Sequence, residues 1–204
     1  MLLRIASLIV LAAAAPSFAS ASEKANKKDD GFDALDDFEK DFVVAFGDAK
    51  SWKVVDGVIQ CSGKPNGYIC TKKSYSNYTL TLEVRYPEQA GNTGILNYIA
   101  GKHKIWPACV EVQGLHARFA QIFAMGGAKG PRSNGDEAVR KEARKPHNEW
   151  NKLEITSKDG VISAKLNGAF IGKAGPYEVH KGQIGFQSEG APVHFRNIRI
   201  KELE

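Results

Sequence analysis

The sequence predicts an all-β protein, built as an antiparallel sandwich or jelly roll. Short apolar runs separated by Gly, Pro and Asn recur from Phe42 to the end of the chain, and almost none of them has the 3.6-residue period of a helix. Three dipeptides, Asp56–Gly57, Asp159–Gly160 and Asn167–Gly168, lie between candidate strands and favour the two-residue turns of β-hairpins. Many short strands joined by such turns are typical of two packed antiparallel sheets.

The first 21 residues have the pattern of a secretory signal peptide. Arg4 precedes an apolar run over residues 5–15, and Ala19 and Ala21 flank Ser20, which matches the charged, apolar and small-residue regions of such peptides. The alternative, a membrane anchor, is disfavoured because the run is short for a bilayer core of roughly 30 Å. No Cys follows the run, which disfavours a lipoprotein. We therefore expect cleavage after Ala21 and a periplasmic or secreted protein with no further membrane span.

The remaining chain is predicted to form one domain. Residues 22–40 are charged and poor in aliphatic side chains, which predicts a flexible lead-in. Residues 41–204 suffice for a single sandwich domain with its own core. The formal charge is +5, or +4 without Arg4, and acids are mixed among the bases. This pattern argues against a nucleic-acid partner, which would call for a basic stripe with interleaved aromatics, and leaves weak attraction to an acidic polymer open.

The expected strands follow one another closely. The clearest is YTLTLEVRY, residues 78–86, in which apolar and polar residues alternate between the two faces. Other candidates are WKVV and VIQC, TGILNYIA, WPACVEVQG, ARFAQIFAM, the strands around the two later hairpin signals, GQIGFQS and VHFRNIRIKEL. One exception is an insertion over residues 126–147, whose second half, DEAVRKEARK, fits one or two helical turns or an edge strand. A loop of this length in a compact domain is usually functional or mobile.

The three cysteines allow two interpretations. Cys61 and Cys70 flank the turn-rich stretch CSGKPNGY, so they could form a disulfide across a hairpin in an exported protein. Equally, they could be two small buried apolar residues. Cys109 is left over in both cases, and no CxxC motif or Cys/His cluster indicates zinc.

The stretch WPACVEVQG, Trp106 to Gly114, is the most informative strand for function. Ala108, Val110 and Val112 share one face, while Cys109, Glu111 and Gln113 share the other. Sugar-cleaving jelly rolls often place carboxylates at such positions, and a retaining glycosidase needs two of them about 5 Å apart. This strand has one acid, and nothing local places Glu189 or Glu83 beside it. An ordinary solvated strand residue is the competing interpretation of Glu111.

Other polar residues form a looser set of candidates. Trp106 could stack on a sugar ring or belong to the core. His103, Lys104, His116 and Arg118 lie within sixteen residues and could bind a polar ligand, a metal or an oxyanion, although such residues are more often plain surface. Asn92, in GNTG, is either a turn residue or a site residue.

Several motifs, taken in order, resemble the 3-keto-disaccharide hydrolase domain family of exported bacterial proteins. They are DGVIQCSGKPNGYICT, YTLTLEVRY, GNTGIL, IWPACVEVQG, KPHNEWNKLEI, DGVISAKLNG and GFQSEGAPVHFRNIRIKEL, and they span Trp52 to Leu203. The resemblance implies a concanavalin-like jelly-roll β-sandwich of two antiparallel sheets. It also implies a site on the concave face and action on glycosides oxidised at C3. The residues carried over by motif are Asn92, Glu111 and Gln113, with His116 and the QSEG segment, residues 187–190 with Glu189, added.

The chemistry of a 3-keto-glycoside suits a site with few carboxylates. The ketone acidifies the C2 hydrogen, so one base and donors for the enolate oxygen would permit elimination of the C1 substituent, after which water could add. We expect Glu111 and His116 to be catalytic, and Asn92, Gln113, Lys104, Trp106, Arg118 and Glu189 to bind substrate. We predict no cofactor, although a divalent metal held by His103, Glu111 and His116 stays open. The alternatives are a carbohydrate-binding module without catalysis and a structural or adhesive exported domain.

Overall fold

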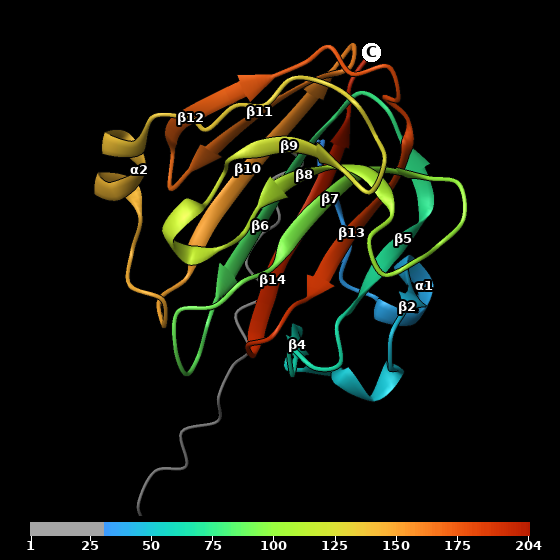
Figure 1. Ribbon diagram of the computed structural model, residues 1–204. Coiled ribbons are helices and arrows are strands. Elements are labelled where there is room, and N and C mark those ends of the chain that lie inside the picture. Colours follow the sequence, from blue (N-terminus) through green and yellow to red (C-terminus); the bar gives the residue numbers. More distant parts are fainter. Residues whose placement is uncertain (1–30) are drawn as a thin grey trace, which may run out of the picture. The chain divides into compact units, whose positions relative to one another are not determined.

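The computed structural model describes residues 31–204, which form two antiparallel sheets packed face to face (Figure 1). The larger sheet has the order β12-β11-β10-β6-β14-β4-β3, with β1 paired to β14. Its strands are β12(Ala169–Ala174), β11(Val161–Leu166), β10(Asn151–Lys158), β6(Tyr78–Arg85), β14(Val193–Glu202), β4(Val58–Cys61), β3(Trp52–Val55) and β1(Asp33–Ala34). The concanavalin-like jelly-roll fold expected from the sequence is confirmed.

The smaller sheet carries the candidate functional strand. Its order is β2-β5-β13-β7-β8-β9. The strands are β2(Phe42–Phe46), β5(Gly67–Tyr75), β13(Gly182–Ser188), β7(Gly94–Ala100), β8(Ala108–Gln113) and β9(Ile122–Met125). This six-stranded sheet lies in front in Figure 1, so its outer face points toward the viewer.

The core forms because alternating strands of both sheets direct apolar residues inward. In β6, Leu80 and Leu82 are buried and pair with Ile155 and Leu153 of β10. Across the interface, the six-stranded sheet contributes Ile95, Val110, Val112, Ile184 and Phe186 to the same apolar cluster. Full burial of one such side chain stabilises the fold by about 1.5–3 kcal/mol. The alternation predicted for WPACVEVQG is therefore confirmed for its apolar face.

The predicted hairpin turns are present and have the required backbone. Asp56–Gly57 joins β3 to β4, Asp159–Gly160 joins β10 to β11, and Asn167–Gly168 joins β11 to β12. All six residues have φ between 49° and 90°. Asp, Asn and Gly tolerate this left-handed region, which two-residue hairpin turns require.

The cysteines follow the second of the two interpretations. All three are free and buried. The expectation that Cys61 and Cys70 face each other across a hairpin is wrong, because β4 belongs to the eight-stranded sheet and β5 to the six-stranded sheet. Cys61 lies in the main core, whereas Cys70 and Cys109 belong to a smaller apolar cluster with Tyr68, Leu96 and Ile99.

The insertion over residues 126–147 contains both a helix and an edge pairing. The helix α2(Glu137–Ala143) begins after Asp136, whose side chain accepts a hydrogen bond from the Val139 N–H. Upstream, Ser133 exchanges two backbone hydrogen bonds of 2.9 Å with Ile122 of β9. The insertion therefore extends the six-stranded sheet beyond β9 before it turns into α2.

Part of the expected lead-in is regular structure. Asp33 and Ala34 pair with β14, Leu35 is buried in the core, and α1(Phe38–Asp41) follows. The apolar side chain of Leu35 explains why this segment packs against the core. Residues 22–30 of the lead-in and the expected signal peptide, residues 1–21, lie outside the described residues. Within residues 31–204, no helix combines the length and the apolar character needed to cross a membrane.

Candidate functional site

Glu111 lies on β8 and points to the outer face of the six-stranded sheet. Its neighbours Val110 and Val112 are in the core between the sheets, so the pleat directs Glu111 the other way. The side chain is nevertheless only 4 % exposed. The interpretation of Glu111 as an ordinary solvated strand residue is therefore wrong, since a solvated residue would be open to water.

A row of side chains crosses this face beside Glu111. The strand pairing places Gln187 of β13 beside Gly94 of β7, because Phe186 pairs with Ile95, and Gly94 pairs with Gln113 of β8. A Cβ atom on Gly94 would lie 2.2 Å from Gln187 Oε1 and 2.9 Å from Glu111 Cδ. The glycine in GNTG thus leaves the space in which the ends of the glutamine and glutamate side chains meet.

Four polar atoms in this region have no hydrogen-bond partner. They are Glu111 Oε1, both terminal atoms of Gln187, and Asn92 Oδ1, and all four are buried. An unpaired buried polar group costs about 1–3 kcal/mol. Such groups are rare in folded proteins and call for an explanation, often a functional one. Their grouping on neighbouring residues is consistent with a site that completes its hydrogen bonds to a polar ligand.

Burial also changes the acidity of the site. It raises the pKa of Glu111 to about 8, with the nearby Glu189 charge adding to the shift and Arg132 opposing it. Burial raises the pKa of Glu189 as well, while a hydrogen bond from Asn92 opposes that shift. Asn92 and Glu189 pair as an isolated bridge next to β13. The structure thus brings Glu111, Asn92 and Glu189 together at one end of the sheet face.

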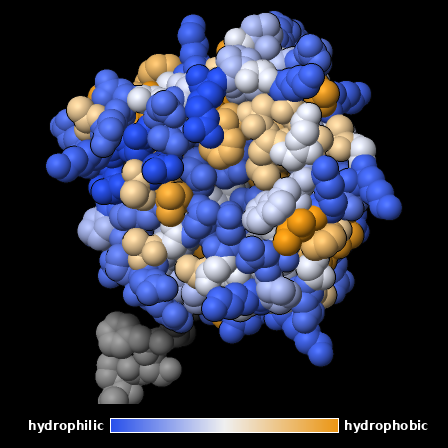
Figure 2. All heavy atoms as spheres, in the orientation of Figure 1, coloured by the Kyte–Doolittle hydropathy of each residue, from blue (hydrophilic) through white to orange (hydrophobic). Residues whose placement is uncertain are grey.

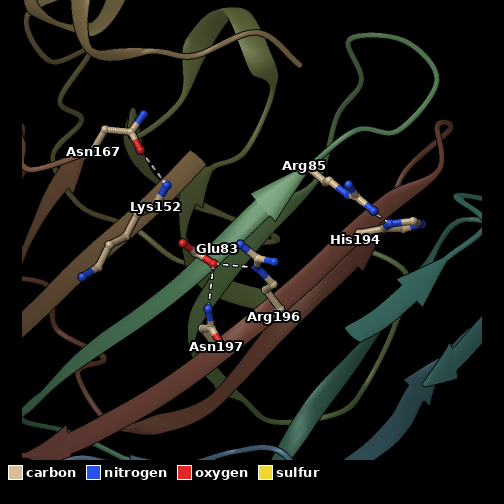
Figure 3. Close-up of polar contacts among 7 residues, drawn as sticks. All are labelled: Glu83, Arg85, Lys152, Asn167, His194, Arg196 and Asn197. Carbon is tan, nitrogen blue, oxygen red and sulfur yellow. Dashed lines mark hydrogen bonds and ion pairs between the residues drawn. The ribbon is translucent and has the colours of Figure 1, made fainter. Parts of the chain in front are cut away.

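Glu83 is not the second acid of this site. It lies on β6, and its carboxylate accepts hydrogen bonds of 2.7 Å from Arg196 and Asn197 of β14 (Figure 3). These residues lie on the outer face of the eight-stranded sheet, because the buried Leu82 and Val84 on either side of Glu83 face the core. Glu83 is therefore separated from Glu111 by the whole thickness of the sandwich.

Gln113 and His116 make contacts that hold the chain locally. Gln113 Oε1 accepts a hydrogen bond of 2.7 Å from the Leu115 N–H. His116 begins the 3-10 helix η2(His116–Arg118), and its Nε2 is 2.9 Å from the Lys145 carbonyl. Burial lowers the pKa of the His116 imidazole. None of the described contacts of that ring involves Glu111.

The remaining predicted residues lie further along the sheet. Lys104 and Trp106 belong to the segment between β7 and β8, at the end of β8 opposite Gln113. Lys104 Nζ donates to the Gly126 carbonyl at 3.0 Å, and Trp106 is 37 % exposed. Trp106 lies five positions before Glu111, which in an extended chain is a span of up to roughly 17 Å. Arg118 is exposed on η2.

The sequence reasoning singled out none of three further residues of this region, although Gln187 belongs to the QSEG segment that the resemblance added. Gln187 is next to Gly94, and Arg132 acts on the pKa of Glu111. Tyr68 pairs with Gln187 in the sheet, and its hydroxyl is 2.9 Å from His103 Nδ1. The alternation in GQIGFQS is a signal that could have indicated Gln187. Arg132 could not have been found, because its position depends on how the insertion folds back along β9.

The surface over the six-stranded sheet is mostly hydrophilic, with apolar residues scattered over it in small groups (Figure 2). Within residues 31–204, no group of three or more His, Cys, Asp or Glu side chains is arranged to hold a metal ion. The three residues left open as metal ligands, His103, Glu111 and His116, do not form such a group: His103 contacts Tyr68 and His116 contacts the Lys145 carbonyl.

Several solved structures share this fold. A protein from Parabacteroides distasonis assigned as a glycosyl hydrolase is 22 % identical, with a TM-score of 0.63 over 85 % of this chain and 95 % of the other. The carbohydrate-binding module CBM66 from Bacillus subtilis is 15 % identical, with a TM-score of 0.61 over 80 % and 96 %. A β-glucanase from Bacillus licheniformis is 10 % identical, with a TM-score of 0.54 over 84 % and 97 %. At these identities the likeness concerns the fold.

Sequence comparison supplies the family. No curated protein is matched by this chain. Residues 27–201, which include both sheets and the site around Glu111, match the family described as the 3-keto-alpha-glucoside-1,2-lyase-like domain. The match confirms the resemblance inferred from the motifs, and this carbohydrate-active jelly roll therefore belongs to the 3-keto-disaccharide hydrolase family.

Proposed function

We propose that this protein cleaves glycosides that carry a ketone at C3, by elimination across C1 and C2, with Glu111 as the base. The observation that carries the proposal is the buried Oε1 of Glu111, which has no hydrogen-bond partner, beside the Gln187 amide, both of whose terminal atoms also lack one. The family description, 3-keto-alpha-glucoside-1,2-lyase-like domain, supports the choice of reaction.

The reaction needs one base and hydrogen-bond donors. Ionised Glu111 takes the C2 proton, and the C–H electron pair forms an enolate whose negative charge rests on the C3 oxygen. The amide of Gln187 donates to that oxygen, as oxyanion-stabilising groups do in other enzymes. The enolate then re-forms the ketone as a double bond forms between C1 and C2 and the C1–O bond breaks. The leaving oxygen takes back one proton, so that elimination is balanced, and later addition of water gives net hydrolysis.

The environment of Glu111 matches the demands on a base. Burial disfavours its charged form, so the ionised carboxylate is a stronger base than a solvated one. A carboxyl with a pKa of about 8 still ionises appreciably near neutral pH, where general bases work best. Because Glu111 is only 4 % exposed, the reacting ring reaches it only if the surrounding side chains move aside on binding.

The direct test replaces Glu111 by Gln, which keeps the shape and removes the proton-accepting oxygen. With 4-nitrophenyl 3-keto-α-D-glucopyranoside, we expect the release of nitrophenol by Glu111→Gln to fall by about 10²–10⁴, the usual contribution of general-base catalysis. Glu83→Gln is the matched control, since it changes the same residue type on the opposite side of the sandwich. Turnover by Glu111→Gln within severalfold of the original protein would rule out this assignment.

A second candidate is a carbohydrate-binding module without catalysis. The fold shared with CBM66 favours it. It predicts saturable binding of a glycoside in calorimetry, with no release of the aglycone from either the ordinary or the 3-keto glucoside.

A further inference from the structure

A surface depression of about 500 Å³ adjoins the candidate site. It is rich in arginine and contains a single acid. Its lining consists of Ala117, Arg118, Gln121, Arg132, Asn134, Glu137 and Arg140.

The sheet register links this depression to Glu111. Phe123 pairs with Glu111, and the Ile122–Ser133 bridge sets Arg132 opposite Phe123. Because neighbouring strands lie about 4.8 Å apart, Arg132 is about 10 Å across the sheet from Glu111. The depression therefore lies on the β9 side of Glu111, where the C1 substituent of a sugar ring over Glu111 would lie if the ring turned that substituent toward β9.

A second connected row continues in the same direction. The Gln113 N–H donates to the Gln121 carbonyl at 2.8 Å, and the Ile122–Ser133 bridge sets Gln121 beside Asn134. Amide side chains thus run from the candidate site into the depression. They offer hydrogen bonds to a polar substrate along its length.

The arginines of the depression are not neutralised by ion pairs. In the part of the chain from residue 31 to residue 204, no carboxylate lies within salt-bridge distance of Arg118, Arg132 or Arg140. Arg132 lies over the Phe123 ring, 4.5 Å from its centroid, which leaves the edge of its guanidinium available. Arg140 is buried and donates to the carbonyls of Phe119 and Asn134. It therefore adds positive charge to the depression and stabilises the backbone that lines it.

We propose that this depression is a subsite for a carboxylate on the leaving-group side of the substrate, held chiefly by Arg132 and Arg118. The proposal rests on the proposed function, because it assigns the leaving group of that reaction. Guanidinium groups bind carboxylates through paired N–H donors. Two exposed arginines beside a buried third, with Glu137 as the one opposing charge in the lining, favour an acidic aglycone over a neutral one.

The test compares two aglycones of similar size, 4-carboxyphenyl and 4-carbamoylphenyl, on 3-keto-α-D-glucopyranoside. We expect kcat/KM to favour the carboxylate substrate at least tenfold at low salt, and we expect this ratio to fall as salt screens the arginines. Arg132→Gln should reduce the ratio to within about twofold, and Arg118→Gln should reduce it in part. The ratio is the readout because it cancels any general effect of a substitution on turnover. Arg85→Gln, which removes the same charge on the eight-stranded sheet near His194 (Figure 3), is the control and should keep the ratio.

The outcomes separate this inference from the proposed function. A ratio below twofold in the original protein, or an equal loss on both substrates in Arg132→Gln, overturns the subsite while the reaction stands. A higher kcat/KM for a 4-sulfophenyl substrate than for the carboxylate rejects the carboxylate assignment. If neither substrate is cleaved, the subsite is tested by calorimetry, which measures the binding of 4-carboxyphenyl and of 4-carbamoylphenyl α-D-glucopyranoside. Tighter binding of the carboxylate that is lost in Arg132→Gln supports the subsite, and equal or absent binding rejects it.

Discussion

Gln187 and Glu111 meet over Gly94, where a Cβ atom would lie 2.2 Å from Gln187 Oε1 and 2.9 Å from Glu111 Cδ. The glutamine comes from β13 and the glutamate from β8, on either side of β7. Neither buried side-chain end is fully hydrogen-bonded within the protein. A glycine is needed at this point because any side chain would fill the space between them.

Replacing Gly94 by Ala should disable the site and leave the sheet intact. The added methyl group would displace Gln187 and Glu111, and misplacement of reacting groups by about 1 Å can cost about 10²-fold in rate. Turnover of the nitrophenyl 3-keto-glucoside measures the loss, and circular dichroism checks the fold. Gly57→Ala is the contrasting variant, since a Cβ there meets no atom within 4 Å but φ is +72°. It should lower the melting temperature and keep the activity per folded molecule. Unchanged turnover in Gly94→Ala would contradict the site geometry.

The activity should rise with pH. If ionised Glu111 is the base, protonation below its pKa of about 8 removes the active form, so kcat/KM should increase with pH and level off above about 8. The pH dependence of kcat/KM reports the free enzyme, in which this pKa applies. A profile that falls with pH across the same range would assign Glu111 as an acid instead.

Replacing Glu189 by Gln should move that profile to lower pH. The negative charge of Glu189 raises the pKa of Glu111, and the neutral amide removes this repulsion. The position of the rising limb of kcat/KM is the measurement. Arg132→Gln should move the same limb to higher pH, because Arg132 opposes the shift. If the rising limb moved in the same direction in both variants, the charges of Glu189 and Arg132 would not be the cause of the shifts.

Glu111→Gln should be more stable than the original protein at alkaline pH. The folded pKa of Glu111 lies above its ordinary value of 4.5, so between these two values the folded state holds more protons than the unfolded state. The free energy of unfolding therefore falls as pH rises from about 4.5 to about 8. Glutamine does not ionise, so the gain in melting temperature should be larger at pH 8.5 than at pH 5. A pH-independent difference would mean that Glu111 is not buried in its protonated form.

Periodicity determined the strand faces. The alternation in Tyr78–Tyr86 and in WPACVEVQG placed Leu80, Leu82, Val110 and Val112 in the core. The Asp–Gly and Asn–Gly dipeptides marked their turns because only a few residue types accept a positive φ. Both signals are local, so they needed no knowledge of which strands are neighbours. For the same reason they could show that Glu111 faces away from the core without showing whether it is buried.

The sequence by itself thus determined the class of fold, the family and the face on which Glu111 lies. Only the tertiary structure decided which residues surround it. Strand order in the six-stranded sheet, β13-β7-β8-β9, brings Gln187 next to Gly94, and the return of the insertion along β9 brings Arg132 into the row of Glu111 and Phe123. Such neighbours are set by the packing of strands that are distant in the chain, and the energy of that packing has no local signature in the residues themselves.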